Sequence, residues 1–128
     1  MEQPVVLVCV TTQKSCERLI EAGAKAAAAM QAKLHVIHVA GSHQRFFNTL
    51  NEADALEFLF GVSKTHEAEM TVVRSEDVAQ TLVDYVRENG VHMVIFGQSP
   101  DADKPGNLIE KVREMLADET IAIAVQAR

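Results

Sequence analysis

Five short apolar runs, rich in β-branched residues, are separated along this chain by segments with helical periodicity. The runs cover residues 4–10, 34–39, 70–74, 92–96 and 120–125. The second, fourth and fifth are nearly continuous in apolar residues, which is typical of strands covered on both faces of a sheet. This alternation predicts an open parallel sheet with helices on both faces, joined by right-handed crossovers.

The segments between the runs have the spacing of helices that pack one face on a sheet. The expected helices cover residues 15–32, 43–67, 77–89 and 107–116. The first carries a stripe of small residues that includes Gly23, Ala24 and Ala27, and such a stripe lets a helix lie close to a sheet. We expect Gly90 to end the third helix and Asn107 to cap the fourth.

The segment 43–67 carries more large apolar residues than one helix face can bury. It holds four of the five phenylalanines of the chain, which are Phe46, Phe47, Phe58 and Phe60. We expect a helix wedged between the sheet and neighbouring elements. The alternative is an apolar surface over residues 46–60 that faces a protein partner.

The composition is that of a soluble globular domain, with 48% hydrophobic and 23% charged residues. The 128 residues contain no linker, repeat or low-complexity tract, so we expect residues 1–128 to form a single domain. The net charge of −6 creates no field that would attract nucleic acid.

The sequence predicts no segment that would direct the chain to a membrane or out of the cell. No apolar run approaches the ~20 residues of a membrane span, and the first residues lack the basic region of a secretory signal. Cys9 and Cys16 lack CxxC spacing, so we expect buried or incidental thiols. A cytoplasmic location follows as the default.

Ligands of an open parallel sheet bind beyond the carboxyl ends of the strands, where the strand order reverses. The segments that follow the first, second and fourth runs are 10–15, 40–43 and 97–107. The first lacks GxGxxG, and the chain contains neither GxxxxGK[ST] nor a GxSxG elbow. The sequence therefore predicts a protein that is not an enzyme.

Two histidines lie three residues apart in the second run. His35 and His38 point to opposite faces of a strand, so they cannot bind one metal ion. We interpret His35 as a tolerated strand residue and His38 as a hydrogen-bonded structural residue. The alternative for His38 is that it lines the ligand cleft. Glu69 belongs to a charge run that we interpret as a solvated face.

Three stretches resemble the universal stress protein family, and the match as a whole covers nearly the whole chain but is weakest over residues 41–75. The first covers residues 5–39 and reads VVLVCVTTQKSCERLIEAGAKAAAAMQAKLHVIHV. Its first strand and helix are especially similar to those of the universal stress protein domain in osmosensitive potassium-channel sensor kinases. The others are HMVIFG, similar to the DLIVMG strand of the family, and GNLIEKVREMLADETIAIAV. The resemblance implies a three-layer α/β/α, Rossmann-like fold of the adenine nucleotide alpha hydrolase type, with strand order 3-2-1-4-5.

The resemblance also implies a dimer that forms by antiparallel pairing of the last strands. Residues 120–125 would form an edge strand, and TIAIAV contains no Lys or Pro to protect that edge. Pairing with a second copy about a two-fold axis would satisfy its exposed backbone groups. We therefore expect a homodimer through Thr120 to Val125.

Nucleotide binders of this family resemble one another in two features. They have an acidic residue at the end of strand 1, and a G-x2-G-x9-G-[ST] loop after strand 4 that holds the phosphates. Here Thr11 and Thr12 stand in place of the acid. Gly97 matches the first glycine of the loop, but Pro100 stands where the second would be.

The contents of this loop also disfavour a triphosphate. Gly106 and Asn107 match the closing G-[ST] only if the loop is four residues shorter, and Asp101 and Asp103 outnumber Lys104. A carboxylate about 4 Å from a phosphate charge costs on the order of 4 kcal/mol at an effective dielectric constant of about 20. A helix N-terminus returns only ~0.3–2 kcal/mol.

Two hypotheses follow from the sequence. The first is a non-enzymatic regulatory or sensing domain of the stress response that needs no cofactor and does not bind ATP in the usual mode of the family. The alternative is a stress protein that binds ATP, AMP or a cyclic dinucleotide through a rebuilt phosphate loop. Its candidate contact residues are then Thr11, Thr12, His38, Val39, Gly97, Ser99, Gly106 and Asn107.

Overall fold

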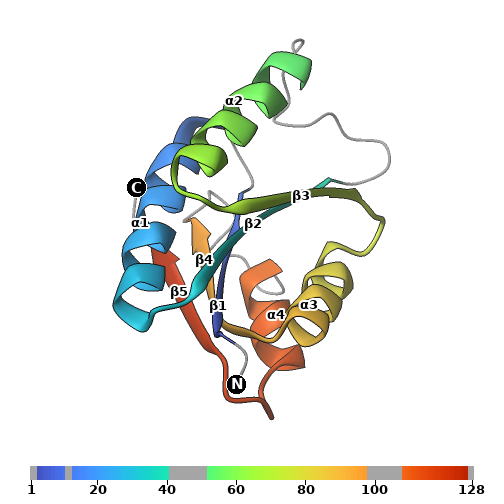
Figure 1. Ribbon diagram of the computed structural model, residues 1–128. Coiled ribbons are helices and arrows are strands. Elements are labelled where there is room, and N and C mark those ends of the chain that lie inside the picture. Colours follow the sequence, from blue (N-terminus) through green and yellow to red (C-terminus); the bar gives the residue numbers. More distant parts are fainter. Residues whose placement is uncertain (1–2, 11–12, 41–51, 98–107, 127–128) are drawn as a thin grey trace.

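Strands and helices alternate along the whole described chain. The structure, a computed structural model, describes residues 3–10, 13–40, 52–97 and 108–126. In chain order the elements are β1 (Val5–Cys9), α1 (Gln13–Met30), β2 (Lys33–Ala40), α2 (Glu52–Thr65), β3 (Glu69–Arg74), α3 (Val78–Asn89), β4 (Val91–Gly97), α4 (Leu108–Met115) and β5 (Ala122–Gln126) (Figure 1). The five predicted strands are all present, with ends within two residues of the predicted ones.

The strands form one parallel sheet in the order β3-β2-β1-β4-β5, which confirms the predicted fold class. Helices α1 and α2 cover one face, and α3 and α4 cover the other (Figure 1). The chain runs from β1 outward to β3 and then returns to the far side of β1 as β4. The strand order therefore reverses between β1 and β4, the position at which such sheets bind ligands.

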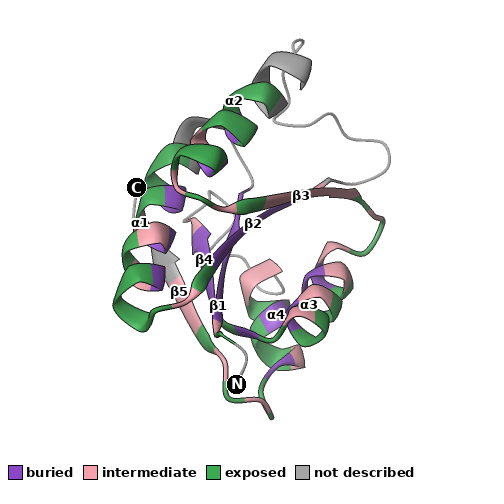
Figure 2. Ribbon diagram, in the orientation of Figure 1, coloured by how far each residue is buried: buried purple, intermediate pink, exposed green. Residues whose placement is uncertain are grey.

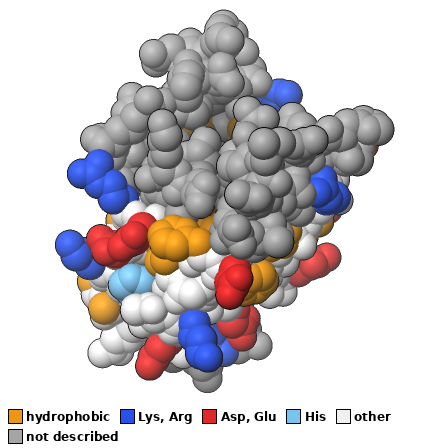
Figure 3. All heavy atoms as spheres, turned by 90° about the horizontal axis from the view of Figure 1, so that it is seen from above, with side chains coloured by type: hydrophobic (Ala, Val, Ile, Leu, Met, Phe, Trp, Pro, Cys, Tyr) orange, Lys and Arg blue, Asp and Glu red, His pale blue; other side chains and the backbone are white. Residues whose placement is uncertain are grey.

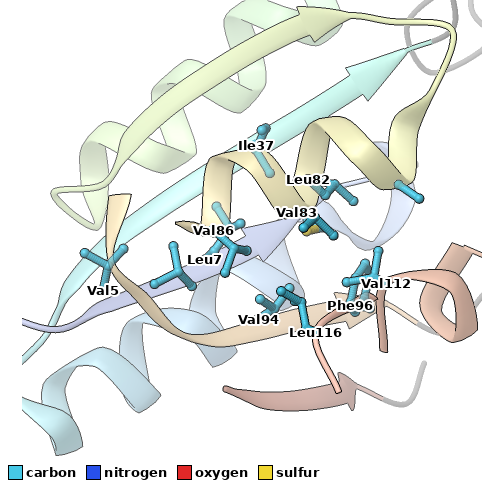
Figure 4. Close-up of a cluster of buried hydrophobic side chains, with 13 residues drawn as sticks. Val5, Leu7, Ile37, Leu82, Val83, Val86, Val94, Phe96, Val112 and Leu116 are labelled. Carbon is cyan, nitrogen blue, oxygen red and sulfur yellow. The ribbon is translucent and has the colours of Figure 1, made fainter. Parts of the chain in front are cut away.

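Successive residues of the central strand supply two separate cores. Val6 and Val8 pack beneath α1 and α2, whereas Val5 and Leu7 pack beneath α3 and α4 (Figure 4). All five residues of β1 are buried, because this strand has a neighbour on each side and helices on both faces (Figure 2). None of the helices in the described ranges is long and apolar enough to cross a membrane.

Local sequence explains the placement of two helices. A Cβ atom on Gly23 of α1 would collide with Cγ2 of Val8, so the small-residue stripe does let α1 lie close to the sheet. Helix α3 begins after Asp77, whose carboxylate accepts the N–H of Gln80 at 3.0 Å. It ends, as predicted, at Gly90, where φ is 63°.

Helix α2 differs from the predicted packing. Leu59 is fully buried against the sheet, but Phe58 and Phe60 are 43% and 50% exposed. Each is one residue from Leu59, so its side chain points about 100° away from the buried direction. The expectation of a wedged helix therefore holds for Leu59 and is wrong for these two phenylalanines. Phe46 and Phe47 lie outside the described residues.

Strand β5 is less covered than its continuous apolar sequence predicted. Ala122 is exposed, and Ile123 and Ala124 are only partly buried. The reason is its position, since β5 ends the described sheet and pairs there with β4 alone. Ile123 packs against the core beneath α3 and α4, and Ala124 against the core beneath α1 and α2, so the predicted cover on both faces is present but partial.

Candidate functional site

The candidate site is the edge of the sheet at which the parallel strands end. Figure 3 views the molecule from above, and charged side chains of both signs lie around its rim. Of the predicted contact residues, the structure describes His38, Val39 and Gly97. The others lie outside the described residues and are Thr11, Thr12, Ser99, Gly106 and Asn107.

Gly97 is the last residue of β4 and packs against helix α1. A Cβ atom at this position would lie 2.8 Å from Cδ1 of Leu19 and 3.5 Å from its Cγ and Cδ2. The Leu19 side chain is 1% exposed and forms part of the core beneath α1. Because contacts as short as 2.8 Å are repulsive and Leu19 is buried, helix packing favours a glycine at this position.

His38 lies near the carboxyl end of β2 and is bound there to Val10, the residue that follows β1. Its imidazole is 4% exposed, and its Nδ1 lies 2.6 Å from the carbonyl oxygen of Val10. A carbonyl only accepts hydrogen bonds, so Nδ1 carries the proton and donates it. This contact confirms the interpretation of His38 as a hydrogen-bonded structural residue.

Burial is the main cause of a lowered pKa for His38. The carbonyl of Val10 opposes this effect, while the positive charge of Arg74 adds to it. The ring is therefore neutral near pH 7, with the proton on Nδ1 and a lone pair on Nε2. In this form His38 can donate to a carbonyl but cannot serve as a cationic phosphate ligand.

Val39 lies at the same edge, one residue further along β2. The N–H of Val10 donates to the carbonyl of Ile37 at 2.9 Å, so the main-chain groups of Ile37 face β1. Residues two apart in a strand direct their main-chain groups to the same side. The N–H and C=O of Val39 therefore face the side on which β1 ends.

A hydrogen-bonded network lies on the other face of β2, around His35. Its Nε2 is 3.3 Å from the carboxylate of Glu69, and its Nδ1 is 2.8 Å from the hydroxyl of Tyr85. Since a carboxylate only accepts, Nε2 carries the proton and Nδ1 accepts from the tyrosine. Thr71 in turn forms a side-chain hydrogen bond with Tyr85.

The surroundings keep this network uncharged at His35 and Tyr85. Burial lowers the pKa of His35, and the carboxylate of Glu69 only partly opposes it. Burial also raises the pKa of Tyr85, while Thr71 opposes that shift. The network links β2 to β3 through Glu69 and to α3 through Tyr85, so its role is structural.

The interpretation of His35 is therefore wrong, because His35 is not merely tolerated. Glu69 is exposed, as a solvated charge run predicts, and its carboxylate also contacts His35. The signal that could have found the pair is the parallel register, in which His35 of β2 stands opposite Glu69 of β3. The expectation that His35 and His38 point to opposite faces is confirmed by their separate contacts.

The described residues contain no assembly for metal chemistry. Within them, no group of three or more His, Cys, Asp or Glu side chains could hold a metal ion. Cys9 is buried in the core beneath α3 and α4, and burial raises the pKa of its thiol far above the usual range. The prediction of a buried thiol is confirmed for Cys9.

Comparisons with known proteins agree with this architecture. The chain resembles a universal stress protein from Archaeoglobus fulgidus, with a TM-score of 0.69 and 14% identity over 95% of this chain and 92% of that one. It also resembles a universal stress protein in complex with cAMP, with a TM-score of 0.66 and 14% identity over 99% and 98% of the two chains.

A third structure, the Archaeoglobus fulgidus protein in complex with dAMP, has a TM-score of 0.64 and 14% identity over 97% of each chain. No curated protein sequence matches this chain significantly. The sequence model of the Universal stress protein family matches residues 4–109, which is most of the chain. The chain therefore belongs to the universal stress protein family.

Proposed function

We propose that this protein is a non-enzymatic regulatory module that does not hold ATP in the usual mode of its family. The observation that carries the proposal is the contact of Gly97 with Leu19. Gly97 is the one residue that matches the first glycine of the nucleotide loop, and packing explains it without a ligand. Pro100 then stands in place of the second glycine, and its ring provides no N–H for a phosphate.

The described part of the binding edge supports a role other than catalysis. His38 is 4% exposed and its Nδ1–H is held by the carbonyl of Val10, which fits a structural role. Cys9, at the end of β1, is buried with a raised thiol pKa. A signalling role is supported by the similarity of the first crossover to the domain of osmosensitive potassium-channel sensor kinases.

The module would act as one domain over residues 1–128 and as a homodimer through Thr120 to Val125. Support for the dimer comes from β5, where Ala122 is exposed on the strand that ends the described sheet. Exposure of Phe58 and Phe60 supports a protein partner at residues 46–60.

The dimer is tested by light scattering at micromolar protein concentration. Ala122→Lys places a charge on the exposed edge strand and is expected to give monomers. Ala117→Lys is the matched control, because Ala117 is also exposed but lies in the turn before β5. A wild-type protein that is already monomeric would contradict the dimer.

A second candidate function is the binding of a nucleotide with a single phosphate. Two structures of this fold were solved with cAMP and dAMP, and such ligands bring fewer charges to an acidic loop than ATP does. The proposed contact residues are those that the sequence predicted, which are Thr11, Thr12, His38, Val39, Gly97, Ser99, Gly106 and Asn107.

Thermal shift separates these functions. A ligand at 100 times its Kd stabilises a fold by about 2.7 kcal/mol, which raises the melting temperature by several degrees. ATP, ADP, AMP, cAMP and cyclic di-AMP would be compared, with and without magnesium. We expect no shift with ATP. A shift with AMP or cAMP that Asn107→Ala abolishes would establish the second candidate, and a shift with ATP would overturn the first.

A further inference from the structure

The carbonyl of Val10 is bound in an unusual way for the end of a parallel strand. Val10 continues the β1–β2 ladder through its N–H, which donates to Ile37 at 2.9 Å. In a regular ladder its carbonyl would next accept the N–H of Val39. Instead the carbonyl accepts Nδ1–H of His38 at 2.6 Å, and no main-chain hydrogen bond joins Val39 to Val10 in the described structure.

We propose that His38 is a positioning residue that replaces the Val39 N–H as the donor to Val10. The imidazole then fixes the end of β1 and leaves the main-chain N–H of Val39 directed toward the binding edge. Val39 is a contact residue of the proposed second function, so a role of this N–H toward a ligand rests on that function, whereas the role of His38 toward Val10 does not.

The burial of His38 makes the replacement specific. At 4% exposure His38 is enclosed by the protein, so its Nδ1–H cannot turn to solvent. The hydrogen bond is short, and its donor is buried. Loss of the donor would leave the carbonyl of Val10 buried without a partner, which costs about 1–3 kcal/mol of folding free energy. The contact should therefore persist in the folded protein in the absence of any ligand.

The two histidines of β2 should consequently carry their protons on different nitrogens. The contact with Val10 requires Nδ1–H at His38, and the contact with Glu69 requires Nε2–H at His35. Side-chain nitrogen NMR spectra of the full chain distinguish these forms directly near pH 7. We expect opposite tautomers for the two residues, and an Nε2–H tautomer at His38 would overturn the proposal.

Two variants of similar shape, His38→Asn and His38→Leu, separate the effect of the hydrogen-bond donor from that of side-chain size. Asparagine and leucine both place an atom where Nδ1 of His38 lies, but only asparagine can donate from it. Amide hydrogen exchange of Val10, measured without ligand, should be about tenfold faster in His38→Leu than in the wild type and within about threefold in His38→Asn. Equal exchange of Val10 in the two variants would overturn the proposal.

His35→Leu serves as the matched control, because it removes a buried histidine from the same strand on the opposite face. Its global stability should fall, while the exchange of Val10 relative to other amides of β1 should stay as in the wild type. A selective increase at Val10 in this control would contradict the specific role of His38.

Binding of AMP and cAMP gives a separate outcome. If either binds the wild type, its affinity should fall at least about tenfold in His38→Leu, recover in His38→Asn and be retained in His35→Leu. Unchanged affinity in His38→Leu would overturn the positioning role. If neither binds any variant, the second proposed function fails, and the tautomer and the exchange of Val10 decide the role of His38.

Discussion

Replacement of Gly97 by alanine should destabilise the fold without any ligand being present. The new methyl carbon would lie 2.8 Å from Cδ1 of Leu19, well inside the ~3.5–4.0 Å of a favourable carbon contact. Leu19 is 1% exposed, so it cannot swing into solvent. Overpacking of this kind costs about 1–3 kcal/mol, and the lower entropy of the unfolded alanine chain offsets ~0.4–1 kcal/mol. We expect a net loss of about 1–2 kcal/mol.

Urea unfolding of a double-mutant cycle measures this contact. Leu19→Ala alone should cost about 2–5 kcal/mol, because it leaves a cavity beneath α1. In the double variant the methyl group introduced by Gly97→Ala occupies part of that cavity, so the combined loss should be smaller than the sum by about 1–2 kcal/mol. All proteins must be compared at one concentration, because dimerisation would otherwise change the apparent stability.

Gly61→Ala is the matched control for the cycle. Gly61 lies inside α2, is exposed, and has no neighbouring atom within 4 Å of the place where a Cβ atom would be added, so alanine there should stabilise by ~0.5–1 kcal/mol. If Gly97→Ala is neutral, or if its effect and that of Leu19→Ala add within about 0.5 kcal/mol, packing does not explain Gly97. A ligand would then be the better explanation of this glycine.

Asp77→Ala removes the N-terminal cap of α3 and should lower the free energy of urea unfolding by about 0.5–2 kcal/mol. Asp77→Ser can still cap the helix and should retain most of that stability, so equal losses in the two variants would refute the cap. Stability should also fall in acid, since burial lowers the pKa values of His35 and His38 and the unfolded chain then binds more protons. This contribution should be complete above about pH 6.5 and decline below it, and urea midpoints that do not change between about pH 7.5 and 5.5 would contradict it. In a Cys16→Ser variant, the buried thiol of Cys9 should react with a disulfide reagent only after unfolding, and rapid reaction in the native protein would refute its burial.

The fold could be predicted because the local signals agree with one another. Apolar runs, small residues at helical spacing and Gly90 all indicate the same alternation of strands and helices, and each is a property of neighbouring residues. The exposed Phe58 and Phe60 were harder to predict. Periodicity shows that a helix has more apolar residues than one face holds, but only the packed structure shows that Leu59 is the buried one.

The candidate site was predictable in position but not in its contacts. The rule for parallel sheets places His38, Val39 and Gly97 at the binding edge from sequence alone. The partners of these residues are far away along the chain, as with Leu19 for Gly97 and Val10 for His38. Such pairs depend on strand register and helix packing, which a single sequence does not display.

The central claim is that the chain lacks the usual ATP-binding mode of its family, and calorimetric titration with magnesium and ATP tests it most directly. The acidic loop, with Asp101 and Asp103, and Pro100 in place of a glycine predict weak binding. We expect no saturable heat, which corresponds to a Kd weaker than about 1 mM, or less than about 4 kcal/mol of binding free energy. One ATP bound per chain with a Kd near ~1 μM would contradict the account.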